Sequence, residues 1–216
     1  MTATELALIR HGEAWCNVDD IVGGPRGCRG LTEQGAQQAR ALADRFATEA
    51  EIVDVLYSSP RLRARQTAEL VADMLGLPVR VDDGLRDQDF GDADGEPRST
   101  LYCGFPGNPI LEPGRAPAPG AEPWSAYVAR VRRTLHRLSR IHSGQRLMLV
   151  CHGETVNAAH HVFLGLPDGW PGPLPLTVAN TAITRWRQLP WDIHRLNLGE
   201  RWNLQAHNDT EHLNNL

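Results

Sequence analysis

Two histidines with the same local surroundings are the residues whose type and spacing could do chemistry. His11 stands after Arg10 at the end of the apolar run 6–9, and His152 stands just beyond the apolar run 147–150. A short, continuously apolar run that ends in polar residues is typical of a buried strand that runs into a loop. Parallel strands bring their carboxyl ends to one edge of a sheet, so we expect both imidazoles to lie together. Each histidine is followed by a glycine, which lets a bulky anion approach the backbone closely.

The chemistry that suits these residues is transfer of a phosphoryl group. A phosphomonoester is close to dianionic at neutral pH, and its transferring group keeps that charge on three oxygens. Arg10 and Arg63 offer permanently charged forks that can bind these oxygens two at a time. Both arginines also disfavour protonation of a nearby imidazole, which would keep His11 neutral and nucleophilic. His152 is expected to donate to the phosphoryl oxygens, and Asn17 either donates to them or only forms a turn.

Strands and helices that alternate along the chain would position these groups. Apolar runs predict buried strands, and apolar residues at helical spacing predict helices that each bury one stripe. Their alternation predicts an α/β fold, a three-layer α/β/α sandwich with a mainly parallel central sheet. The predicted strands are 6–9, 54–57 and 147–150, and the predicted helices are 32–46, one that begins at Ser59 and Pro60, and 124–141.

The remaining segments predict a single domain over residues 1–216, without internal repeats or linkers. Residues 96–123 are rich in proline and glycine and have no sustained periodicity, so we expect an irregular, lid-like insertion there. Residues 181–186 and 191–194 are expected to close the sheet as a pair of strands. The conformation of the insertion, and therefore the identity of the substrate, cannot be read from the sequence.

Short motifs follow one another in a definite order along nearly the whole chain. They are Leu8–Glu13 with Leu31-Thr32-x-x-Gly35, Ser58–Ala68, Leu85–Asp87 with Phe90-Gly91, Val150–Thr155, and Asn180–Thr184 with Asn208–Leu213. Arg-His-Gly alone is a weak signal, but five ordered segments at these separations are specific. Together they resemble the histidine phosphatase superfamily, which includes the cofactor-dependent phosphoglycerate mutases. The resemblance implies a phosphoglycerate mutase-like sandwich and catalysis through a phosphohistidine.

The site residues that the resemblance implies agree with those chosen on chemical grounds. His11 would carry the phosphoryl group and His152 would not, and Arg10 and Arg63 would bind the phosphoryl oxygens with no metal or cofactor. The segment that holds the proton donor carries Asp87, where the family usually has a glutamate that is longer by one methylene.

The assignment of the general acid to Asp87 therefore stays open. Asp89 and Glu13 are the nearest alternative donors, and Asp87 itself could only cap a turn. A carboxyl group that protonates an alkoxide contributes roughly 100-fold to 10,000-fold in rate, so the choice has a measurable consequence.

Three alternative functions compete with a phosphatase that acts on a small phosphorylated metabolite. The acidic residues between 82 and 96 could bind a divalent cation, which favours a metal-dependent hydrolase. The protein could be a module that binds a phosphorylated ligand without turnover. The main support for this alternative is Asp87, which is shorter than the usual glutamate. A mutase would return the phosphoryl group to its substrate, but the segment after Leu85 lacks the basic and aromatic run of those enzymes, so we expect hydrolysis.

Composition excludes other classes of function. The 216 residues contain no lysine, which excludes a Walker-type phosphate loop and every Schiff-base mechanism. A net charge of −4, without arginines interleaved with aromatic residues, argues against a nucleic-acid partner. No apolar stretch is long enough to span a bilayer and no signal peptide is evident, so we expect a cytoplasmic protein without a membrane partner. A homodimer is compatible with the sequence.

Weaker signals have structural explanations. The arginines between 130 and 140 are expected to form the solvated face of a helix, and His160 and His161 are expected to lie on a helix surface. The four cysteines lack the spacing of a zinc or redox site, so we expect free thiols, with a Cys16–Cys28 disulfide as the alternative.

Overall fold

A six-stranded sheet forms the centre of the molecule in the computed structural model, which describes residues 3–101, 111–167, 169–190, 199–214 and 216. The strands lie in the order β3-β2-β4-β1-β5-β6. The pairs β3–β2, β2–β4 and β4–β1 are parallel, and β5 is antiparallel to both β1 and β6. The strands are β1 (Glu5–Arg10), β2 (Val55–Ser58), β3 (Val79–Val81), β4 (Arg146–Cys151), β5 (Ile183–Pro190) and β6 (Glu200–Asp209).

Two hydrophobic cores lie on opposite faces of this sheet, because side chains alternate along each strand. In β1, Leu6 and Leu8 join one core, whereas Ala7 and Ile9 join the other. All four side chains are almost completely buried. A strand covered on both faces needs apolar residues at every position, which explains why its sequence reads as a continuous apolar run.

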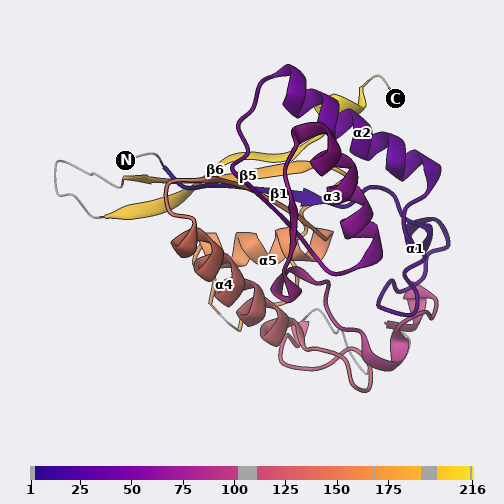
Figure 1. Ribbon diagram of the computed structural model, residues 1–216. Coiled ribbons are helices and arrows are strands. Elements are labelled where there is room, and N and C mark those ends of the chain that lie inside the picture. The colour runs from indigo at the N-terminus through magenta and orange to yellow at the C-terminus, as the bar shows by residue number, and fades with distance from the viewer. Residues whose placement is uncertain (1–2, 102–110, 168, 191–198, 215) are drawn as a thin grey trace.

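Helices cover both faces, as Figure 1 shows. Helices α2 (Glu33–Thr48) and α3 (Leu62–Leu75) pack against each other on one face, and α4 (Trp124–Ile141) and α5 (Gly153–Phe163) pack on the other. The short helix α1 (Trp15–Val18) follows β1 at the end of the molecule where its carboxyl edge lies. The predicted α/β sandwich with a mainly parallel central sheet is therefore confirmed.

Helix α2 begins as predicted, because the Thr32 side chain accepts a hydrogen bond from the Gly35 amide. The predicted start of α3 at Ser59 and Pro60 is wrong. The helix begins at Leu62, with Arg61 in the capping position. The Ser59 hydroxyl is instead engaged with the imidazole of His152, at 2.8 Å from Nε2, and also accepts a hydrogen bond from the Arg61 amide. Ser59 and Pro60 therefore precede α3, but Ser59 does not cap it.

The sheet closes with a different strand from the one predicted. Strand β5 covers most of the predicted segment 181–186, but its partner is β6, Glu200–Asp209. The predicted partner 191–194 lies outside the described residues. Of the predicted insertion 96–123, the described parts are turns and one 3₁₀ segment, Arg98–Leu101, and the rest lies at 102–110, outside the described residues. Among the described residues, no helix is both long and apolar enough to cross a membrane.

The prediction that His160 and His161 lie on the surface is wrong, since both are buried. Adjacent positions on a helix do point apart, but α5 is covered on both of these sides. His161 packs edge-on against Trp124 of α4, and His160 packs against Trp186 of β5. Nε2 of His160 also lies 3.1 Å from Nδ1 of His207 in β6. Burial lowers the pKa of His160 to about 4, so this imidazole is neutral at physiological pH.

Candidate active site

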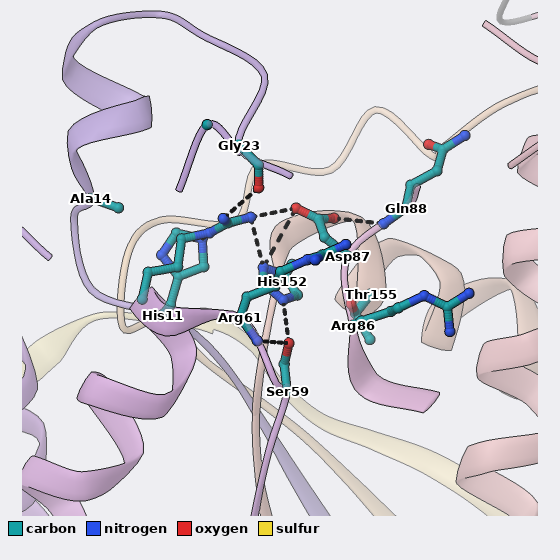
Figure 2. Close-up of polar contacts among 12 residues, drawn as sticks. His11, Ala14, Gly23, Ser59, Arg61, Arg86, Asp87, Gln88, His152 and Thr155 are labelled. Carbon is teal, nitrogen blue, oxygen red and sulfur yellow. Dashed lines mark hydrogen bonds and ion pairs between the residues drawn. The ribbon is translucent and has the colours of Figure 1, made fainter. Parts of the chain in front are cut away.

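A cavity of about 350 Å³ lies at the carboxyl ends of β1 and β4. Its wall includes five of the predicted site residues, Arg10, His11, Asn17, Arg63 and Asp87. His152 is not part of this wall but lies directly behind it, and its ring centre is 5.3 Å from that of His11. Figure 2 shows His11, Asp87 and His152 converging from three different segments of the chain. The structure therefore brings together the six predicted site residues Arg10, His11, Asn17, Arg63, Asp87 and His152.

The loop after β1 fixes the position and the proton of His11. Its amide donates to the Cys151 carbonyl of β4, and its carbonyl accepts from the side-chain amide of Asn180. Ring nitrogen Nδ1 lies 2.7 Å from the Gly12 carbonyl, which can only accept, so Nδ1 carries the proton. Nε2 accepts from Nε of Arg63 at 2.9 Å and therefore carries an electron pair rather than a proton. His11 is therefore a neutral imidazole with an unprotonated Nε2.

The electrostatic surroundings favour the same state. Burial, followed by the positive charges of Arg63 and Arg10, holds the pKa of His11 well below its ordinary value. The glycine that follows His11 has a packing role that the sequence did not reveal. A Cβ at Gly12 would lie 2.4 Å from the Gly35 carbonyl oxygen in the first turn of α2, so only glycine fits this contact.

Arg63 connects the charged groups of the site. Nη1 donates to the Gly23 carbonyl at 2.6 Å, Nη2 donates to Asp87 Oδ2 at 2.6 Å, and Nε donates to His11. The guanidinium is almost completely buried. Burial, the largest single effect, acts to lower the pKa of Arg63, but Asp87 together with the nearby thiols of Cys16 and Cys28 outweighs it, and the net shift is upward. A permanent positive charge is thus held beside His11 by three directed contacts.

His152 is also neutral in this structure. Its Nδ1 lies 3.1 Å from Nη2 of Arg63, which can only donate, so Nδ1 accepts and Nε2–H points to the Ser59 hydroxyl at 2.8 Å. Burial and then Arg63 hold the pKa of His152 well below its ordinary value. The expected role of His152 as a donor to phosphoryl oxygens therefore requires a proton on Nδ1, which this arrangement does not have.

Asp87 is held at the cavity by contacts on both sides of its side chain. Oδ2 accepts from Arg63 and lies 3.5 Å from Nδ1 of His152, and Oδ1 accepts from the Gln88 amide (Figure 2). The alternative donors lie elsewhere. Asp89 accepts from the Gly91 amide and Glu13 accepts from the Thr32 hydroxyl, and neither lines the cavity.

Arg130 supports the backbone of Asp87, and the prediction that it belongs to a solvated helix face is wrong for this residue. Its guanidinium is buried, forms an ion pair with Glu122 at 2.6 Å, and donates to the carbonyls of Gly84, Arg86 and Asp87. The spacing of the arginines along α4 could not show that position 130 faces inward, because Glu122 reaches it from the segment before the helix.

The remaining predicted residues line the cavity. Nη1 of Arg10 donates to the Val178 carbonyl at 2.5 Å, which fixes the guanidinium at the wall. Burial lowers the pKa of Arg10, opposed by Glu154 and Asp87. The side-chain oxygen of Asn17 accepts from the Ala14 amide at 3.1 Å, so Asn17 stabilises the turn at α1. It also lines the cavity, so its two expected roles are compatible.

One acidic residue of the wall was missed by sequence reasoning. Glu154 is the second residue of α5, two positions after His152, and it lines the cavity. Burial, and then the charge of Asp87, raises the pKa of Glu154, although Arg10 and Arg98 act to lower it. Its place in the first turn of a helix that starts at a site histidine is a signal that could have identified it.

The geometry gives no support to a metal site. Within the described residues, no three histidine, cysteine or acidic side chains form a group that could hold an ion. Asp82, Asp89 and Asp94 of the acidic run accept hydrogen bonds from nearby backbone amides instead. Cys16, Cys28 and Cys151 are free thiols as expected, whereas Cys103 lies outside the described residues.

Comparison with known proteins agrees with this geometry. A family model described as the histidine phosphatase superfamily, branch 1, matches residues 6–199. A 2,3-bisphosphoglycerate-dependent phosphoglycerate mutase of a Methylobacterium species is 31% identical over 74% of this chain and 81% of its own. A phosphoglycerate mutase-like protein of Arabidopsis thaliana is 28% identical over 97% and 86%.

Solved structures show the same fold. A mycobacterial glucosyl-3-phosphoglycerate phosphatase in complex with VO3 superimposes with a TM-score of 0.77 at 27% identity, covering 94% of this chain and 98% of the other. The names of the relatives divide between phosphatases and mutases. They therefore agree on phosphoryl transfer but do not specify whether the phosphoryl group goes to water or back to the substrate. The chain belongs to the histidine phosphatase superfamily.

Proposed function

We propose that this protein is a phosphomonoester hydrolase that acts through a phosphohistidine on His11. In the first step, Nε2 of His11 attacks phosphorus, the bond between phosphorus and the ester oxygen breaks, and Asp87 gives its proton to the departing oxygen. In the second step, a water molecule attacks the phosphorus of phosphohistidine and its proton passes to Asp87. The products are an alcohol and inorganic phosphate, and His11 and Asp87 return to their starting states.

The observation that carries this proposal is the protonation state of His11. Its Nδ1–H is fixed on the Gly12 carbonyl, and its Nε2 electron pair faces the guanidinium of Arg63 in the cavity wall. An imidazole that is merely structural has no need of two permanent positive charges beside it. A phosphoryl group does need them, because its charge is spread over three oxygens during transfer.

The positive charge of the site also supports a reaction without a metal ion. Arg10 and Arg63 supply at fixed positions the charge that a magnesium ion provides in other phosphoryl-transfer enzymes. Hydrolysis is favoured over mutase activity for the reason drawn from the sequence, since the segment after Leu85 lacks the basic and aromatic run of mutases. A small phosphorylated metabolite remains the proposed substrate class.

The test is to trap the covalent intermediate. Rapid acid-free quenching with a ³²P-labelled or mass-resolved substrate should give one phosphorylated peptide, which contains His11. His11→Ala should abolish both labelling and turnover, whereas His136→Ala, an exposed position on α4, should change neither. Phosphate on any other residue, or turnover that survives in His11→Ala, contradicts the proposal. Faster interconversion of 3- and 2-phosphoglycerate than release of phosphate would show a mutase instead.

A further inference from the structure

A second, smaller cavity of about 130 Å³ adjoins the phosphate cavity. The two cavities share Phe90, Arg98 and Glu154 in their walls. The walls differ in character away from this junction. The first is formed mainly by charged and polar groups, whereas the second includes Leu101, Pro117, Trp124 and Pro173. A phosphomonoester bound with its phosphoryl group between Arg10 and Arg63 therefore has an apolar space available for its leaving group.

Glu154 stands at the junction and is unusual among the acidic groups of the site. Asp87 has three polar neighbours, but the Glu154 carboxyl has no hydrogen bond or ion pair with another described residue. Arg10 and Arg98 interact with it only at longer range. A negative charge next to the binding site of a phosphate dianion repels the substrate unless a positive charge lies between them. Among the described residues, none supplies that charge in contact with Glu154, whereas a cationic group on a bound molecule would supply it.

We propose that Glu154 binds a cationic group on the leaving alcohol, close to the ester bond, and that the second cavity holds an apolar extension of the same alcohol. The substrate class is then an aminoalkyl phosphomonoester with an apolar substituent. This inference rests on the proposed hydrolase activity and specifies its substrate. An ammonium placed between Glu154 and the phosphoryl group would be attracted by both. The repulsion between Glu154 and the phosphate would then disfavour esters that lack the ammonium, which makes the site selective for esters that carry it. A hydrogen bond between an ammonium and the Glu154 carboxylate is charge-assisted and therefore stronger than one between neutral groups.

A matched pair of substrates isolates the contact to Glu154. Propyl phosphate has the same shape as 2-aminoethyl phosphate but carries a methyl group in place of the ammonium. We expect kcat/KM to be higher for 2-aminoethyl phosphate by about 10-fold to 100-fold, as for a hydrogen bond between charged groups. Glu154→Gln should remove most of this preference. Glu69→Gln, exposed on α3, is the control and should preserve it.

The apolar cavity is tested separately with 2-amino-3-phenylpropyl phosphate. Its kcat/KM should exceed that of 2-aminoethyl phosphate by at least about 10-fold through burial of the phenyl ring. Leu101 lines the apolar cavity, so Leu101→Ser should reduce the preference for the phenyl-substituted ester. It should not change the preference for 2-aminoethyl phosphate over propyl phosphate.

Each alternative result has a definite meaning. The proposal is overturned if the wild-type protein shows no preference for 2-aminoethyl over propyl phosphate. It is equally overturned if Glu154→Gln slows both substrates to the same extent and spares p-nitrophenyl phosphate, because Glu154 would then be a proton donor. Failure of the underlying hydrolase activity looks different, since the wild-type protein would then hydrolyse none of these esters, p-nitrophenyl phosphate included.

Discussion

Replacing Asp87 by asparagine separates its chemical role from its structural one. Asparagine has the same shape, and its amide oxygen can still accept the hydrogen bond that Nη2 of Arg63 now donates to Oδ2 at 2.6 Å. The carbonyl of residue 87 remains bound to Arg130. What the variant loses is a proton that the side chain can give to the leaving oxygen. We therefore expect the cavity to keep its shape and the proton transfer to fail.

The size of the effect follows from the leaving group. General acid catalysis contributes roughly 100-fold to 10,000-fold, or about 3 to 5 kcal/mol of activation free energy, when the leaving group is an alkoxide. It contributes little for p-nitrophenolate, which leaves without a proton. The loss of a charged partner for Arg63 should also cost about 2 kcal/mol of folding stability, as for a hydrogen bond to a charged group. In a chain of this length that corresponds to a decrease in Tm of about 4 to 8 °C.

The assay compares kcat/KM for an alkyl phosphate and for p-nitrophenyl phosphate in each variant, with Tm as the control for folding. Asp87→Asn should slow the alkyl phosphate severely and p-nitrophenyl phosphate by less than about 10-fold. Asp87→Glu restores a proton donor and should recover much of the alkyl phosphate activity. Asp89→Asn is the matched control, since Asp89 binds the Gly91 amide and does not line the cavity. Equal slowing of both substrates by Asp87→Asn would refute the assignment of the proton donor.

Three further predictions follow from the same geometry. Activity should survive an excess of EDTA, because Arg10 and Arg63 carry the positive charge, and loss of activity restored by a divalent ion would contradict this. Arg130→Met should lower the alkyl-to-nitrophenyl ratio of kcat/KM by about 10-fold through displacement of Asp87, whereas the exposed Arg133→Met should not. The free energy of unfolding should decrease as the pH falls from about 6.5 towards 4, because the unfolded chain protonates histidines whose pKa values are lowered in the folded state. His160, with a pKa of about 4, contributes roughly 3 kcal/mol to this loss, so His160→Gln should flatten the dependence measured by urea unfolding.

Most of the site could be predicted because its residues are tied to strand ends. His11 follows β1 and His152 follows β4, and the parallel pairing of these strands, with Arg10 opposite Cys151, places the two histidines at one edge. A short, continuous apolar run indicates such a strand, because a strand that is covered on both faces needs apolar residues at every position, whereas an exposed or half-buried strand does not. The fold class and the catalytic cluster therefore follow from the same pattern.

The errors concern residues whose surroundings come from distant segments. Arg130 and His161 both looked solvated from the periodicity of their own helices. Arg130 is covered by Glu122 and three backbone carbonyls, and His161 is covered by Trp124. Periodicity shows which positions share a face of a helix, but not how many faces the fold will cover. Local sequence also failed for Ser59, because its hydroxyl contacts His152, which lies 93 positions away, and does not cap the helix that follows.

The contacts of Arg63 explain how binding and chemistry are coupled in the proposed mechanism. Its guanidinium already donates to the nucleophile, to the proton donor and to the Gly23 carbonyl. A phosphoryl group that enters the cavity must therefore replace existing partners rather than fill empty positions. Replacement of the contact at Nε exposes the electron pair of His11, and replacement at Nη2 frees Oδ2 of Asp87 from its contact with Arg63. The same exchange of hydrogen bonds thus makes the proposed nucleophile available and frees the Asp87 side chain to face the leaving oxygen, so both groups become competent only when a phosphoryl group is present to react.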